Sequence, residues 1–284
     1  MSHSYRLILG CPDRVGIVAA VSRFIAERDG WIIEADQYSD PASHHFFMRV
    51  VIRAESLNCP LDQFRRDFVE VAARYEMNWR LHDSAQRQRV AILASRESHC
   101  LYDLLHRWKD GELLFDLPCV IGNHDHLAEA VEWHGVPFYH VPMEPARKQA
   151  GFDRIHLLLQ QHRVDVVVLA RFMQILPNVL CQHYAGQIIN IHHSFLPSFI
   201  GAKPYHQAAE RGVKLVGATC HYVTEALDAG PIIEQDVVRV SHHDTIEDMI
   251  RLGRDVEKQV LARGLRYHLE DRALIHGNKT VIFA

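Results

Sequence analysis

Residues 164–170 read VDVVVLA, and six of these seven side chains are apolar. A strand that is apolar on both sides is covered on both faces, which is typical of a parallel sheet with helices above and below it. Strand-like runs and helix-like repeats alternate around this segment. The pattern predicts an α/β domain with a mostly parallel, doubly wound sheet over residues 90–284.

The other elements expected in this domain follow from apolar periodicity and from turn residues. Two strand-like runs, at 216–225 and 230–240, look like a pair near one edge of the sheet. The remaining strands are expected at 90–95, 117–123, 137–142 and 187–192, and the helices at 99–111, 126–135, 147–163, 202–212 and 245–271.

The N-terminal residues follow a different order. Strand-like runs at 5–10, 31–40, 44–54 and 77–83 are separated by helix-like segments within 11–30 and 60–76. This βαββαβ order predicts a ferredoxin-like domain over residues 1–83, joined by a polar linker, 84–89, to the second domain. The inward stripe of its first helix is expected to consist of Val15, Val18, Ala19, Ser22, Phe24 and Ile25.

Bulk composition excludes several classes of protein. The net charge of −4 gives no support for a nucleic-acid partner, and no run approaches the roughly 18 apolar residues of a membrane helix. The six cysteines are scattered without a CxxC pair, and the N-terminus lacks an apolar signal region, so we expect a cytoplasmic protein with reduced thiols. The 21 histidines form no HExxH pattern, so no metal site is expected.

The stretch NIHHSFLPSFIGAKP, at 190–204, begins where the strand 187–192 ends. Asn190 and His192 are two positions apart, so their side chains share one face of that strand. Ligands bind beyond the carboxyl ends of strands in such sheets. The best candidate for a third polar group is Asp228, in the loop between the paired strands. These residues form the predicted catalytic set.

Each of the three also has an ordinary structural explanation. Asn190 could cap a turn, His192 could be a hydrogen-bonded core histidine, and Asp228 could be a turn residue. Their joint position beside loop-forming prolines and glycines favours a site.

Three blocks of sequence, in this order, resemble the folate-dependent formyltransferase core: FMQIL at 172–176, INIHHSFLPSFIGAKPYHQAAERG at 189–212, and GATCHYVTEALDAGPIIEQ at 217–235. In that family an Asn, a His and an Asp form the catalytic set, and the matching residues are Asn190, His192 and Asp228. The resemblance also implies a folate pocket lined by the first block and by loop 222–228, mostly through backbone groups. The implied residues are Phe172, Met173, Ile175, Leu176, Val223, Thr224 and Leu227.

The sequence departs from the transferases in two places. Their glycine-rich loop, which holds a substrate phosphate, corresponds to SRESHCLYD at 95–103, which has no glycine and contains Glu97. His193 stands where those enzymes usually have proline. Loss of the phosphate cradle implies that the second substrate is not a sugar phosphate, which leaves water as the formyl acceptor.

The N-terminal CPDRVGIVAAVSRFIAERDGWI resembles an ACT domain, a regulatory module that binds small amino acids. The resemblance implies an effector site at Asp13, Arg14 and Gly16, with glycine, methionine or no effector as alternatives. An ACT domain joined to this core is the arrangement of the formyltetrahydrofolate deformylases. Similarity to that family implies hydrolysis of 10-formyltetrahydrofolate to formate and tetrahydrofolate, no further cofactor, and a homodimer or homotetramer.

Two other functions remain open at this point. One is formyl transfer to a small acceptor; the chain ends soon after the helix expected at 245–271 and has no basic tail for a transfer-RNA substrate. The other is a non-catalytic folate or amino-acid sensor. Release of formate without an added acceptor separates hydrolysis from transfer, and any turnover at all excludes the sensor.

Overall fold

The computed structural model describes residues 3–198 and 204–284. The chain forms two compact units. The first contains Met1–Arg87 together with Glu270–Leu274 and Val281–Ala284, and the second contains Gln88–Leu269 and Ile275–Thr280. The expected second domain ran unbroken from residue 90 to 284, whereas two short C-terminal segments belong to the first unit.

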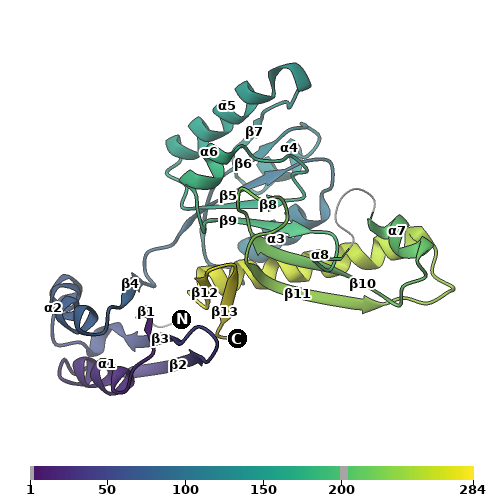
Figure 1. Cartoon of the computed structure of the whole chain (residues 1–284). Coiled ribbons are helices and arrows are strands. Elements are labelled where there is room, and N and C mark those ends of the chain that lie inside the picture. The colour runs from purple at the N-terminus through teal and green to yellow at the C-terminus, as the bar shows by residue number, and fades with distance from the viewer. Residues whose placement is uncertain (1–2, 199–203) are drawn as a thin grey trace. The chain divides into compact units, whose positions relative to one another are not determined.

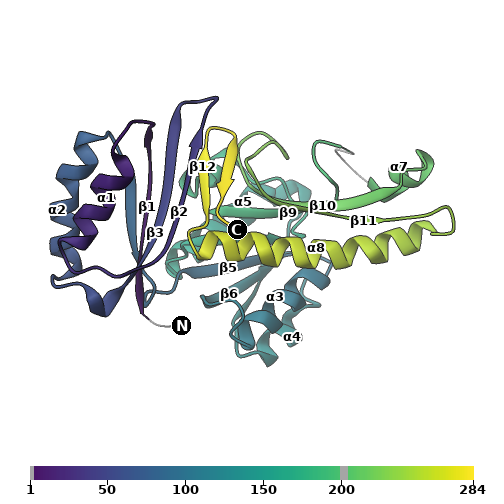
Figure 2. The same cartoon turned by 90° about the horizontal axis from the view of Figure 1, so that it is seen from below.

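The first unit has the expected βαββαβ order. Its elements are β1 (Ser4–Pro12), α1 (Ile17–Ala26), β2 (Ile32–Asp40), β3 (His45–Arg53), the single-turn 3-10 helix η1 (Ala54–Ser56), α2 (Leu61–Arg74) and β4 (Asn78–Asp83). The strands form an antiparallel sheet in the order β2-β3-β1-β4, as in the ferredoxin-like arrangement. Both helices cover one face of it (Figure 2). Three phenylalanine rings pack together between the helices and the sheet. Phe24 meets Phe64 and Phe68 edge to face, and the rings of Phe64 and Phe68 are stacked.

The C-terminal segments bring a buried charge to this unit. Asp271 is 2% exposed and lies 2.7 Å from His82 Nδ1 and 3.3 Å from Arg6 Nη1. Burial opposes ionisation of Asp271, but the hydrogen bond to His82 and the charge of Arg6 outweigh it and lower the pKa of the carboxyl group. Leu274 and Phe283 pack against Ile8 and Phe47 beside it.

The described residues of the second unit form a seven-stranded sheet in the order β11-β10-β9-β8-β5-β6-β7. The strands are β5 (Arg89–Ala94), β6 (Asp116–Gly122), β7 (Phe138–His140), β8 (Val166–Ala170), β9 (Ile188–His192), β10 (Leu215–Tyr222) and β11 (Ile232–Arg239). Strands β7, β6, β5, β8 and β9 are parallel, whereas β10 runs antiparallel to both of its neighbours. The predicted mostly parallel sheet is confirmed.

Helices cover both faces of this sheet. Apolar side chains of α5 and α6 pack with those of β5, β6 and β8 in one core on one face, whereas α3 and α8 pack against each other on the opposite face (Figures 1 and 2). The helices are α3 (His99–Lys109), α4 (Ala128–Trp133), the 3-10 helix η2 (Pro145–Arg147), α5 (Lys148–Gln161), α6 (Asn178–His183), α7 (Pro204–Glu210) and α8 (Ile246–Leu269). Val166, Val167 and Val168 are almost fully buried, as a strand covered on both sides requires.

Some local expectations were wrong or incomplete. Val15 is fully exposed, because Gly16, at φ 95°, turns the chain and α1 begins only at Ile17. The buried stripe of α1 therefore consists of Ile17, Val21, Phe24 and Ile25. Helix α6 and the C-terminal hairpin β12 (Ala273–His276) and β13 (Lys279–Ile282) were not expected. Residues 202–203 of the predicted helix 202–212 lie outside the described residues. No helix of residues 3–198 and 204–284 combines the length and apolarity needed to cross a membrane.

The aromatic core of the first unit yields a stability prediction. Phe68 is fully buried and meets Trp79 edge to face at 4.8 Å. We expect Phe68→Ala to lower the free energy of unfolding of this unit by about 3–5 kcal/mol, through lost burial and a cavity. Denaturant unfolding followed by the fluorescence of Trp79, in a background where Trp31, Trp108 and Trp133 are replaced by phenylalanine, measures this. Val69→Ala, at a neighbouring position that is 55% exposed, is the control and should change the value by less than about 0.5 kcal/mol.

Candidate active site

The candidate site lies where β9 and β10 pair. Asn190 and His192 occupy alternate positions of β9 and share one face. On β10, His221 stands directly opposite Asn190, and Thr219 stands opposite His192. Directly opposite residues of antiparallel strands place their Cβ atoms about 4.5–5.5 Å apart. The pairing therefore gathers four polar side chains on one patch of sheet.

Asp228 reaches this patch from the loop between β10 and β11. The loop closes tightly, because the Tyr222 amide donates to the Pro231 carbonyl. A Cβ atom at Gly230 would lie 1.9 Å from the carbonyl oxygen of Tyr222, so only glycine permits this closure. Asp228 itself has a positive φ of 51°, a conformation that aspartate tolerates better than most residues.

His192 and Asp228 form the central pair of the site. His192 Nδ1 lies 3.4 Å from Asp228 Oδ2, and both side chains are mostly buried, with 7% and 13% exposure. The hydrogen bond and the charge of the His192 imidazole lower the pKa of Asp228 more than burial raises it, so the carboxylate is ionised near neutral pH. His192 Nε2 is buried and has no hydrogen-bond partner among the described residues. With Nδ1 facing the carboxylate, Nε2 is the atom left to interact with a substrate.

His221 orients the Asn190 amide, and the sequence analysis missed it. His221 Nδ1 lies 2.9 Å from the Tyr222 carbonyl, which can only accept, so Nδ1 carries the proton. Nε2 therefore accepts from Asn190 Nδ2 at 3.1 Å. Burial lowers the pKa of His221 and keeps this neutral form. One amide N–H of Asn190 remains for another acceptor. The residue was within reach of sequence reasoning, since it lies in the block GATCHYVTE, but its pairing register was not.

The segment after His192 is held by polar contacts to the neighbouring strands. The Thr219 hydroxyl donates to the Ser194 carbonyl at 2.9 Å and accepts from the Leu196 amide at 3.0 Å. Gln235 of β11 donates to the Leu196 carbonyl. The Ser194 hydroxyl donates to the Ser198 carbonyl, so this hydroxyl is engaged in loop structure.

Some of the side chains expected to line a folate pocket are exposed, and others are buried in the core. Met173, Ile175 and Leu227 are about 60% exposed, Thr224 is exposed and Val223 is half-buried. Phe172 and Leu176 are buried in the core that α5 and α6 form with the sheet, so their side chains face away from solvent. For these two, a ligand could be reached only by backbone atoms.

The expected effector residues lie together in the turn before α1. Asp13 and Arg14 are exposed, and Gly16 is the residue before the first helical turn. The Asp13 amide donates to the His44 carbonyl, Arg14 pairs with Glu76, and the Tyr75 hydroxyl donates to the Gly16 carbonyl.

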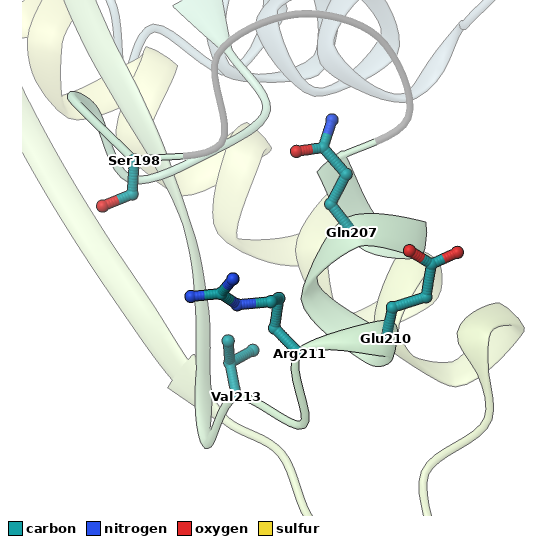
Figure 3. A pocket seen from close by; sticks show the side chains of 5 residues that line it. All are labelled: Ser198, Gln207, Glu210, Arg211 and Val213. Carbon is teal, nitrogen blue, oxygen red and sulfur yellow. The ribbon is translucent and has the colours of Figure 1, made fainter.

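A separate pocket lies against α7. Figure 3 shows the side chains that line it: Ser198, Gln207, Glu210, Arg211 and Val213. It contains none of Asn190, His192 or Asp228, so it is distinct from the candidate site.

Comparison with known proteins identifies the family of this chain. The family model described as Formyl transferase matches residues 88–265. A formyltetrahydrofolate deformylase from Bacillus subtilis is 45% identical over 98% of this chain and 93% of its own length. The crystal structure of a formyltetrahydrofolate deformylase from Pseudomonas syringae is 63% identical, with a TM-score of 0.98 over all of this chain and 95% of the other. The chain belongs to the formyltetrahydrofolate deformylase family.

The transferases are more distant. The crystal structure of glycinamide ribonucleotide transformylase 1 from Symbiobacterium toebii is 32% identical, with a TM-score of 0.66. It covers 70% of this chain and 95% of its own. Only part of the chain is therefore shared with this transformylase, whereas the deformylases match nearly all of it.

The buried His193 makes stability depend on pH. Burial and then the charge of Arg171 lower the pKa of His193 to about 3, against about 6.5 in an unfolded chain. The unfolded state therefore binds a proton first as the pH falls, so stability is full above pH 6.5 and declines below it. We expect a loss of about 2 kcal/mol between pH 7 and pH 5 from this residue.

Denaturant unfolding at the two pH values, for the wild-type protein and His193→Asn, measures the contribution of His193. The variant should lose less stability than the wild type over this range. Equal losses in the two proteins would show that His193 is not the titrating group.

Proposed function

We propose that Asn190, His192 and Asp228 carry out the reaction of this family, hydrolysis of 10-formyltetrahydrofolate to formate and tetrahydrofolate. The observation that supports these roles most directly is the buried, unpartnered Nε2 of His192, on an imidazole whose other nitrogen faces an ionised Asp228. A buried nitrogen without a partner is costly for a purely structural residue, and it suits one that meets a substrate.

In the proposed reaction the two donors polarise the formyl group. The free N–H of Asn190 and the Nε2–H of protonated His192 donate to the formyl oxygen, and both bonds strengthen as the tetrahedral intermediate becomes negative. Removing one preorganised donor of this kind typically costs about 3–4 kcal/mol in the barrier. Asp228 stabilises the imidazolium through Nδ1.

Asp228 also acts as the general base for the attacking water. The water oxygen bonds to the formyl carbon while the carboxylate accepts its proton. As the carbon–nitrogen bond breaks, the proton held by Asp228 passes, directly or through a water molecule, to the leaving nitrogen, so the carboxylate is regenerated, tetrahydrofolate leaves as the amine and formic acid ionises to formate. These steps use only side chains of the chain and water, with the folate as substrate.

Covalent catalysis by Ser194 receives no support from the geometry, because its hydroxyl donates to the Ser198 carbonyl. The exposed apolar residues Met173, Ile175 and Leu227 suit contact with the pterin of the folate. The remaining expected folate residues, Phe172, Leu176, Val223 and Thr224, would act mainly through backbone groups.

The first experiment measures formate and tetrahydrofolate from 10-formyltetrahydrofolate, with no formyl acceptor added. We expect equal amounts of both products. Asp228→Asn should lower kcat at least about 10²-fold, because the carboxylate that accepts the proton is lost while the side-chain volume is kept. Glu225→Gln, an exposed carboxylate in the same loop, is the matched control and should keep the wild-type rate.

Tight folate binding without formate would point instead to a transferase or a sensor. A near wild-type rate for Asp228→Asn would contradict the role given to this carboxylate.

The proposal for the first unit is regulatory and rests on its ferredoxin-like fold and its resemblance to ACT domains. A small amino acid, with glycine and methionine as the candidates, would bind at the turn of Asp13, Arg14 and Gly16 in a cytoplasmic dimer or tetramer. Asp13→Ala should abolish the effector response, measured as rate against amino-acid concentration, and leave the rate without effector unchanged. The reverse result would contradict this assignment.

A further inference from the structure

A buried ionic cluster surrounds Glu257 of α8, outside the proposed catalytic set. The Glu257 side chain is 1% exposed. Its Oε2 lies 2.8 Å from His99 Nε2 and 3.4 Å from Arg171 Nε, and its Oε1 accepts from the Tyr205 hydroxyl at 2.7 Å. The four side chains come from α8, the start of α3, the turn after β8, and α7. Because side chains from four separate segments meet at one buried carboxylate, the cluster is a specific feature of the fold and not a chance contact at the surface.

The cluster occupies the position in this fold where ligands ordinarily bind. Strands β5 and β8 are neighbours, and the chain order reverses between them, since β6 and β7 lie on one side and β9 on the other. Crevices at such switch points take ligands, and the N-terminus of the helix after the first strand favours anions. His99 begins α3 after β5, and Arg171 directly follows β8. Glu257 therefore places the protein's own carboxylate at an anion-binding position.

The charges of the cluster are balanced internally. Burial opposes ionisation of Glu257, but the hydrogen bond to His99 and the charge of Arg171 outweigh it and lower the pKa of the carboxyl group. Glu97 adds a second carboxylate, 2.7 Å from Arg254 and 3.7 Å from His99. An incoming phosphate or carboxylate would meet two negative groups here.

The geometry of Tyr205 shows that the carboxylate is held in place. A Cβ atom at Gly253 would lie 2.0 Å from the Tyr205 hydroxyl oxygen, so the ring packs on the backbone of α8 one turn before Glu257. Arg171 faces Glu257 only through Nε, at 3.4 Å, and both its Nε and its Nη1 are buried without a hydrogen bond in residues 3–198 and 204–284. Removal of Glu257 would leave these donors to another anion.

A metal ion does not suit the cluster. His99, Cys100 and Glu257 bring three ligand atoms within 4.8 Å of one another. Burial raises the pKa of the Cys100 thiol well above its usual value, so no thiolate is offered, and His99 already bonds Glu257.

We propose that Glu257 is a specificity-determining residue: its carboxylate occupies the place that the anionic group of a second substrate would need, and water is left as the formyl acceptor. The inference rests on the proposed hydrolysis and gives a physical reason for it.

The test uses the full-length protein, with inorganic phosphate as a probe of substrate-like anions. Glu257→Ala removes the carboxylate and opens space beside Arg171 and His99. We expect calorimetry to show phosphate binding to this variant at least about tenfold tighter than to the wild type, and phosphate to raise its Tm. Glu257→Gln is the matched control: it removes the charge but keeps the volume, so phosphate should bind it less tightly than Glu257→Ala.

Acetate separates the proposal from a purely structural role, since acetate replaces only the missing carboxylate. Binding of acetate but not phosphate by Glu257→Ala would overturn the proposal, because the crevice would then fit only the side chain's own group. Equal phosphate binding by Glu257→Ala and the wild type would also overturn it.

Loss of a buried partner of Arg171 can prevent folding. In that case Glu257→Ala is refolded in phosphate and in chloride, and Glu97→Ala is titrated with phosphate. Recovery in phosphate or tighter binding by Glu97→Ala supports the proposal, and failure of both overturns it. These measurements do not depend on turnover, so a wild-type protein that released no formate would refute the proposed function without deciding the role of Glu257.

Discussion

The antiparallel pairing of β10 with β9 is the constraint on which the candidate site depends. On its other side β9 pairs in parallel with β8, and only the reversal at β10 places His221 opposite Asn190 and Thr219 opposite His192. His221 orients the side chain of Asn190, and Thr219 holds the segment after His192 through a hydrogen bond to the Ser194 carbonyl. The loop that follows β10 then returns Asp228 to the same patch. A shift of one residue in the register of β10 would turn His221 and Thr219 away from Asn190 and His192, to the other face of the sheet.

The sequence predicts the regular parts of the fold well, because their signals are local. The apolar run of β8 and the βαββαβ order of the first unit needed only periodicity and turn residues. The expected inward stripe of α1 was correct at Phe24 and Ile25 and wrong before them: the positive φ of Gly16 delays the start of the helix to Ile17, and its first turns bury Ile17 and Val21 instead. The C-terminal hairpin was missed because its two strands are only four residues each.

The site residues likewise divide into those that local sequence signals select and those whose roles depend on the folded structure. Asn190, His192 and Asp228 stand beside loop signals, so sequence pattern and resemblance could select them. The roles of His221 and Glu257 could not be found in this way, because they depend on pairing register and on packing between distant segments. Glu257 precedes Lys258 on a long helix and reads as an ordinary exposed glutamate until Tyr205, His99 and Arg171 are seen around it. The positions of Phe172 and Leu176 likewise depend on which face of the loop enters the core.

Asp228 of the candidate active site and Glu257 of the ionic cluster are both buried carboxylates that need a partner, but their partners give them different roles. Asp228 contacts an imidazole whose outer nitrogen remains unpartnered in the described chain, so its charge can act on a substrate through His192. Glu257 is surrounded by His99, Tyr205 and Arg171, so its charge is neutralised within the protein. A buried charge is tolerable only when it is paired, and the identity of the pair decides whether the charge is available for chemistry. In the proposed enzyme the first carboxylate serves the attack of water, and the second keeps a competing anionic acceptor out.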